Sequence, residues 1–273
     1  MVRYTRSGGE ACAVSIRIAR SFSKRDKILF SGYHGWADWY LASNLGASDA
    51  LDGQLMPGLD PNGVPRGLKD TAIPFHCNDL DELKSKANGI EKDIAAIIVE
   101  PARGEDAPEG YLLSLKEYAN EIGAVLIFDE ITSGFRMCTG GIHLKYGVNP
   151  DMAIFAKSMA NGYAMAAIIG TEAVMGSAQS TFISSTNWTE RIGPVAAIAT
   201  IKKYIEKDVS SHIIKIGNNV KMVWSKMAEK HRLPVKITGL PTLGSFYFED
   251  EKNQAMMTYF TIEMLYYWIN IIQ

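Results

Sequence analysis

Short apolar runs alternate with helical patterns along this chain as far as about Ile192. The runs include "KILFSG", "IAAIIVEP" and "AVLIFDE", which are short, rich in β-branched residues and typical of buried strands. Between them, apolar side chains recur at helical spacing, as in "SGGEACAVSIRIARSFS" and in "LSLKEYANEIG", where Gly123 should end the helix. Strands that alternate with helices predict an α/β fold, with a mostly parallel sheet and helices on both of its faces.

Four ionisable side chains, which could take part in catalysis or binding, lie at or just after the ends of predicted strands. These are His34, Glu100, Asp129 and Lys157. In parallel sheets, ligands bind beyond the carboxyl ends of the strands. We therefore expect these side chains to lie at one edge of the sheet.

The pattern changes near Ile192, where two long helical stretches precede the strand-like segment "LPVKITGLPTLGSFYFED". This change predicts a large domain over residues 1–208 and a partial, smaller α+β domain over residues 209–273. The last stretch, "MMTYFTIEMLYYWINIIQ", is apolar but is interrupted by polar residues such as Glu263. We interpret it as a helix that needs a partner surface, because it is too polar to span a bilayer.

Composition argues against several classes of function. The 28 basic and 30 acidic residues give a net charge of −2 without long single-sign runs, so neither nucleic acid nor a membrane is the expected partner. Cys12, Cys77 and Cys138 are odd in number and lack metal-ligand spacing, which argues against a disulfide framework and against a metal site. We expect a cytoplasmic protein that acts on small molecules.

The segment "SGGEACAV" predicts the start of a helix. Ser7 followed by Glu10 forms a capping box, and Gly8 and Gly9 let a ligand approach the backbone closely. The exposed amides and the helix dipole would suit a phosphate group. An ordinary helix cap explains the same residues.

Lys157 follows the strand "MAIF" and precedes small residues, so its amine can be held in a cleft as a nucleophile. Asp129 lies one strand-to-strand unit earlier in the chain. An aspartate that holds a pyridinium nitrogen protonated, together with a lysine that forms a Schiff base, is the usual protein contribution to pyridoxal phosphate chemistry. Taken singly, Lys157 is better explained as a surface lysine, and Asp129 as a helix cap or a surface ion-pair partner.

The segment "GYHGWADWY" adds aromatic side chains after the strand "KILF". Tyr33 or His34 could lie on the face of a planar cofactor, whereas Trp36, Trp39 and Tyr40 are interpreted as packing residues. His34 has no second histidine or cysteine at metal-ligand spacing, so we expect no metal there.

Taken together, the segments "SGGEA", "GYHG", "VEP", "FDEI", "FAKSMANG" and "SSTNWTERIGPVAAIA" occur in the order and approximate spacing of class III aminotransferases. The chain most resembles the glutamate-1-semialdehyde aminomutase branch, over roughly residues 2 to 265. The resemblance implies a fold type I large domain that binds pyridoxal 5'-phosphate. It also implies transfer of an amino group between an amino acid or amine and a carbonyl compound.

Carried over to this sequence, the resemblance assigns roles around the cofactor ring. Lys157 would form the Schiff base and then shuttle a proton. Asp129 would bind the pyridine nitrogen. Tyr33 would stack on one face of the ring, and Ile131 would pack on the other.

The resemblance also implies how the phosphate group is held. Ser7, Gly8 and Gly9 would bind it in one subunit, and Thr186 would reach it from the neighbouring subunit of a homodimer. Glu100 matches a glutamate beneath the site. The family pattern usually has Ser-Gly-Thr in place of Ser7-Gly8-Gly9, so one hydroxyl contact to the phosphate is missing here.

The ends of the chain give a second reading. Family members carry a segment before the first strand of the large domain, and their C-terminal domain continues past the position of Gln273. We therefore weigh an active aminotransferase or aminomutase against a truncated remnant that keeps only a cofactor-binding or interaction core. A generic α/β binding module without a cofactor is a third reading.

Overall fold

The computed structural model describes residues 1–54, 56–102, 104–185 and 188–272. These form two compact units. The first unit is Met1–Ala102 with Ala107–Ser210, and the second unit is Arg103–Asp106 with Ser211–Gln273. The assignment of residues 1–208 to a cofactor-binding domain and of 209–273 to a partial domain stays a prediction.

The first unit is built on one mixed sheet, which has the order β1-β7-β6-β5-β4-β2-β3. β7 pairs antiparallel with β1 and with β6, and the pairs from β6 across to β3 are parallel. The mostly parallel α/β sheet expected from the sequence is therefore confirmed. Its strands are β1 (Val2–Thr5), β2 (Lys27–Ser31), β3 (Ala72–Pro74), β4 (Ile94–Val99), β5 (Val125–Asp129), β6 (Met152–Phe155) and β7 (Ala166–Gly170).

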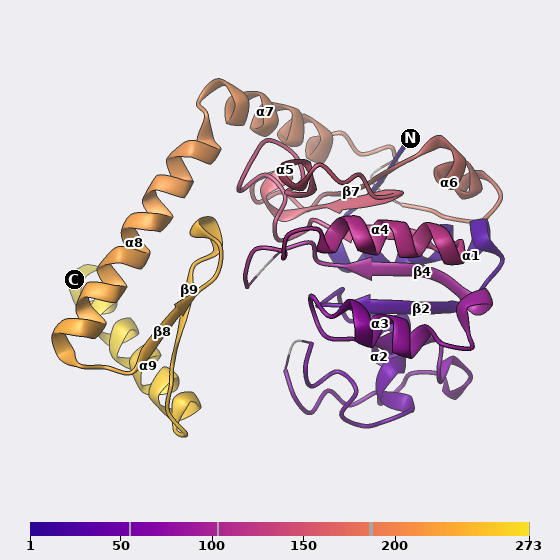
Figure 1. Ribbon diagram of the computed structural model, residues 1–273. Helices are drawn as coiled ribbons and strands as arrows, with labels where there is room; N and C mark the ends of the chain where they lie inside the picture. The colour runs from indigo at the N-terminus through magenta and orange to yellow at the C-terminus, as the bar shows by residue number, and fades with distance from the viewer. Residues whose placement is uncertain (55, 103, 186–187, 273) are drawn as a thin grey trace. The chain divides into compact units, whose positions relative to one another are not determined.

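Helices cover both faces of this sheet (Figure 1). Those of the first unit include three turns of only four or five residues, which carry too few residues for a helical pattern to be read from sequence. The helices of this unit are α1 (Gly8–Ser23), α2 (Asp38–Leu41), α3 (Leu80–Ala87), α4 (Tyr111–Ile122), α5 (His143–Tyr146), α6 (Glu172–Gly176) and α7 (Ile192–Glu206).

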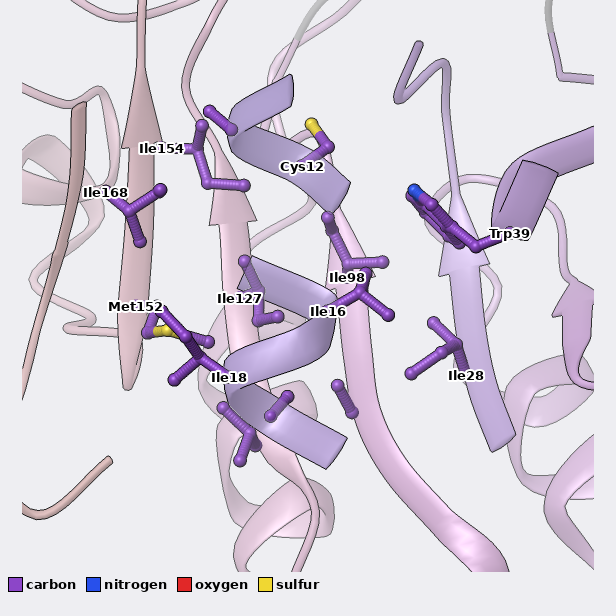
Figure 2. Close-up of a cluster of buried hydrophobic side chains, with 14 of the residues drawn as sticks. Cys12, Ile16, Ile18, Ile28, Trp39, Ile98, Ile127, Met152, Ile154 and Ile168 are labelled. Carbon is purple, nitrogen blue, oxygen red and sulfur yellow. The ribbon is translucent and has the colours of Figure 1, made fainter. Parts of the chain in front are cut away.

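Side chains of the central strands alternate between two cores. Val125 and Ile127 of β5 pack in the core that contains α1, whereas Leu126 and Phe128 pack in the core that contains α3 and α4. Figure 2 shows the first of these cores, in which side chains of α1 lie against β2, β4, β5 and β6. Because alternate residues of a strand point to opposite faces, Asp129 lies on the α1 side of the sheet and Glu130 on the other.

The start of α1 follows the predicted capping pattern with one difference. Ser7 Oγ accepts a hydrogen bond from the Glu10 amide at 3.3 Å, as expected for a cap. The Glu10 carboxylate accepts from the amide of Arg6 at 2.9 Å, one residue before the cap. The carboxylate thus anchors the turn that joins β1 to α1.

The second unit contains α8 (Val209–His231), the antiparallel pair β8 (Val235–Thr238) and β9 (Ser245–Phe248), and α9 (Asn253–Ile272). Its small apolar cluster centres on Phe246, whose ring meets Trp224, Phe248 and Phe260 in edge-on contacts. Among the helices of the described residues, none is long and apolar enough to cross a membrane.

Gly35 and Gly9 lie against each other and offer a matched test of backbone packing. A Cβ on Gly35 would meet Gly9 Cα at 2.7 Å, and Gly35 has a φ of +96°. A Cβ on Gly9 would meet Gly35 Cα at 3.6 Å, an ordinary contact.

We predict that Gly35→Ala lowers the free energy of unfolding by more than about 1 kcal/mol, because alanine is strained at positive φ and has no room here. Gly9→Ala should leave it within about 0.5 kcal/mol. Urea unfolding followed by circular dichroism measures both. Equal effects of the two substitutions would contradict this packing.

Candidate active site

A cavity of about 310 Å³ lies at the carboxyl ends of β2, β5 and β6. Its wall comes from the first turn of α1 and from the segments that follow these three strands. The lining segments are residues 6–9, 33–36, 131–132, 156–157 and 163–165. The cavity is at the lower end of the range for small-molecule sites.

Seven of the ten predicted site residues line this one cavity, namely Ser7, Gly8, Gly9, Tyr33, His34, Ile131 and Lys157. Asp129 and Glu100 are buried beside it and contact residues of the wall. Thr186 lies outside the described residues, so its predicted role stays a prediction.

Asp129 ends β5 and is almost fully buried, with 2% of its surface exposed. Three donors from three segments reach its carboxylate. Oδ2 accepts from His34 Nδ1 at 2.8 Å and from Cys12 Sγ at 3.5 Å, and Oδ1 accepts from the Ile131 amide at 3.0 Å. A carboxylate has about four acceptor positions, so one position on Oδ1 remains for a further donor.

The His34 ring is engaged on both edges. Nδ1 faces Asp129, and Nε2 faces the carbonyl oxygen of Ser31 at 3.1 Å. Both neighbours are acceptors, so the ring is held between a carboxylate oxygen and a carbonyl oxygen and its orientation is fixed.

This geometry revises three interpretations from the sequence. Asp129 already has protein partners, so a ligand is not needed to satisfy its charge. The side chain of His34 is fully buried and bonded to Asp129, which leaves the partly exposed Tyr33 as the aromatic candidate for the face of a planar ligand. Trp36 is also not a packing residue, since 79% of its surface is exposed and it lines the cavity, whereas Trp39 and Tyr40 are buried as expected.

Cys12, His34 and Asp129 place their ligand atoms within 4.8 Å of one another. Burial raises the pKa of the Cys12 thiol well above 9.0, and the charge of Asp129 and its hydrogen bond add to this. The thiol therefore stays protonated as a donor to the carboxylate. The Cys12 thiol and the His34 ring, which is hydrogen-bonded at both of its nitrogens, form a network around the carboxylate of Asp129.

Lys157 begins a short 3₁₀ turn directly after β6, and its φ is +46°. Such a conformation is uncommon for a residue other than glycine and clusters at functional sites. The Lys157 amine donates to Thr132 Oγ1 at 3.0 Å. Sequence reasoning missed Thr132, although it lies three residues after Asp129 in the same loop.

Glu100 holds the segment after β2. Its Oε2 accepts from the Tyr33 amide at 3.2 Å, and a Cβ on Gly32 would meet this oxygen at 2.7 Å. Gly32 has a φ of +107°, so the turn requires glycine for both reasons. Glu100 thus positions Tyr33 through the backbone.

Glu130 was also missed and holds the loop that follows β5. It is fully buried and accepts from His143 Nδ1 at 2.8 Å, from the His143 amide at 3.0 Å and from Ser133 Oγ at 2.5 Å. The signal in the sequence is the alternation along β5, which directs it away from Asp129.

The chemistry of these groups fits pyridoxal 5'-phosphate. The wall offers an amine at Lys157, a planar side chain at Tyr33 and the amides of the first turn of α1. A buried acceptor position remains on Asp129 for a ring N–H. Gly8 allows close packing, because a Cβ there would meet Ile131 Cδ1 at 2.7 Å.

The family model described as "Aminotransferase class-III" matches residues 1–265. The chain belongs to the class III aminotransferase family. It is similar to the 3-aminobutyryl-CoA aminotransferase of Cloacimonas acidaminovorans (strain Evry), at 35% identity over 92% of this chain and 58% of the relative. It is also similar to the glutamate-1-semialdehyde 2,1-aminomutase of Methanocaldococcus jannaschii, at 32% identity over 92% of this chain and 60% of the relative.

Solved structures share the fold. The FumI protein of Sphingopyxis sp. MTA144, solved with pyridoxal phosphate, matches with a TM-score of 0.80 at 22% identity, over 92% of this chain and 58% of that one. An omega-transaminase from Sphaerobacter thermophilus matches with a TM-score of 0.76 at 25% identity, over 91% of this chain and 59% of that one. The fold type I architecture expected for a class III aminotransferase is therefore confirmed. This chain spans somewhat more than half the length of these relatives.

We predict that Cys12 resists thiol reagents in the folded protein even when the pH is raised from 7 to 9, because its raised pKa keeps it protonated and burial blocks access. Exposed Cys77 should react quickly and faster at the higher pH. Labelling with a chromogenic disulfide, followed by peptide mapping, measures both sites. Cys77→Ser should remove the fast phase, and rapid labelling of Cys12 would contradict the network.

We predict that Glu130→Ala lowers the free energy of unfolding by about 3–5 kcal/mol, because it leaves buried His143 and Ser133 without their acceptor. The control is Glu117→Ala on the exposed side of α4, which should change it by less than about 0.5 kcal/mol. Urea unfolding measures both variants. A loss below about 1 kcal/mol at Glu130 would show that its contacts do not hold the loop.

Proposed function

We propose that the protein uses pyridoxal 5'-phosphate to transfer an amino group between an amino acid or amine and a carbonyl compound. The observation that carries this proposal is the convergence of Lys157, Tyr33 and the first turn of α1 on one cavity, with Asp129 behind two residues of the wall. The bound cofactor supplies an electron sink for the bond that breaks next to the amino group.

Lys157 is the nucleophile and the proton carrier in this proposal. Its Nζ lies on the cavity wall, 3.0 Å from Thr132 Oγ1, so the hydroxyl oxygen can orient the amine. Once the amine is neutral, it can attack an aldehyde carbon held in the cavity, and the aldehyde oxygen leaves as water. When released again, the same nitrogen can take a proton from one carbon and deliver it to another.

Asp129, directly behind the wall residues His34 and Ile131, holds the proton of the cofactor ring in this proposal. The remaining acceptor position on Asp129 Oδ1 can receive the N–H of a pyridinium ring. The ring of His34 and the thiol of Cys12 contact Oδ2 and so hold the carboxylate in place. His34 is thus a positioning residue, whereas Asp129 contacts the cofactor.

The proposed partners are a small-molecule amino donor and a carbonyl acceptor. The relatives named above are an aminotransferase of an acyl-CoA and an aminomutase, so either reaction type is compatible with the family. We further propose that the active form is a cytoplasmic homodimer in which Thr186 of one subunit reaches the phosphate site of the other. The family resemblance alone supports this arrangement.

The proposal is tested by adding pyridoxal 5'-phosphate, reducing with borohydride and mapping the modified peptide by mass. We predict visible absorbance in the wild type and a reduced adduct on Lys157. Lys157→Ala should lose both, and the control Lys69→Ala, which changes an exposed lysine away from the cavity, should keep both. A folded wild-type protein without an adduct on Lys157 would overturn the proposal and favour the reading of a remnant core.

A further inference from the structure

Arg6 lies in the turn between β1 and α1, directly before the first residues of the helix. It lines the same cavity as Ser7, Gly8 and Gly9. Its backbone is anchored, because its amide donates to Glu10 Oε2 at 2.9 Å. Over the described ranges, no hydrogen bond and no ion pair engages its guanidinium group. The guanidinium group of Arg6 is therefore available to a ligand at the N-terminus of α1.

The charges on the wall favour an anionic ligand. Arg6 and Lys157 are the cations of the lining, and no aspartate or glutamate is among the described residues that line the cavity. The N-terminus of α1 adds the positive end of a helix dipole and its free amides. The buried carboxylates near the cavity accept hydrogen bonds from protein groups. Glu100, for example, accepts from the amide of Tyr33.

The first turn of α1 has few side-chain donors of its own. Ser7 supplies one hydroxyl, whose oxygen already accepts from the Glu10 amide. Gly8 and Gly9 supply only backbone amides. A guanidinium group can bind two phosphate oxygens at once, in a geometry that matches its planar fork. Arg6 is the charged group of this turn that can do so.

We propose that Arg6 binds the phosphate group of the cofactor and makes the side-chain contact that Gly9 lacks. This inference rests on the proposed function, because it assumes that pyridoxal 5'-phosphate occupies the cavity. The phosphate is favoured over a substrate carboxylate because Arg6 is adjacent in sequence to the helix amides that suit a phosphate.

The test compares two ligands that differ only in the phosphate group, pyridoxal 5'-phosphate and pyridoxal. Their dissociation constants are measured by absorbance titration of the cofactor-free protein. Arg6→Met should weaken binding of the phosphorylated ligand about 10-fold or more and leave pyridoxal unchanged. Arg6→Lys should keep only part of the affinity, since it keeps the charge but loses the planar fork. Arg66→Met removes an exposed arginine away from the cavity and should have no effect.

An equal loss for both ligands, or no loss in Arg6→Met, would overturn the proposal. Circular dichroism checks that the variant is folded. If the wild type forms no adduct on Lys157 with either ligand, the proposed function fails. The role of Arg6 is then tested with inorganic phosphate as the ligand. It should raise the melting temperature of the wild type more than chloride does at equal ionic strength, and Arg6→Met should abolish this difference. An unchanged difference in the variant would reject Arg6 as a phosphate ligand.

Discussion

A single buried carboxylate, that of Asp129, ties the elements of the site together. Its three donors come from α1, from the turn after β2 and from the loop after β5. Breaking a buried ion pair by removing one partner costs about 3–5 kcal/mol, so this network holds the three segments in register with one another. The same contacts fix which atom of Asp129 remains open, because Oδ2 is occupied by protein donors and Oδ1 is not fully used.

The two acidic residues at the end of β5 show how strand geometry separates two tasks. Asp129 points to the α1 side and joins the network of the cavity, whereas Glu130 points to the other side and binds His143 and Ser133. The loop between them and α5 carries Ile131 and Thr132 into the cavity wall. A cavity lined by Arg6 and Lys157 can therefore lie beside two buried carboxylates, because each carboxylate is bonded to its own partners within the protein.

The sequence predicted most of this arrangement because its periodicities are long and consistent. The strand ends at Asp129 and Lys157, and the capped start of α1, all come from local patterns that tertiary contacts did not override. What could not be predicted depends on partners far apart in the chain. Asp129 orients the His34 ring by a hydrogen bond. Thr132 belongs to the site because its hydroxyl accepts from the Lys157 amine. Trp36 precedes the short helix α2 and is exposed, whereas Trp39 lies within α2 and is buried, and no periodicity in the sequence indicates this difference.

The start of α1 also shows that an ordinary cap and an anion site are not alternatives. Ser7 Oγ caps the helix by accepting from the Glu10 amide, which uses a lone pair. Its O–H hydrogen is not needed for the cap, so the same hydroxyl can donate to a phosphate oxygen. A Cβ on Gly8 would require the end of the Ile131 side chain to move, whereas Gly9 has room for a side chain that it does not carry. The cap therefore fixes the start of the helix. Because Gly9 has no side chain, a further side-chain contact to the phosphate would come from Arg6.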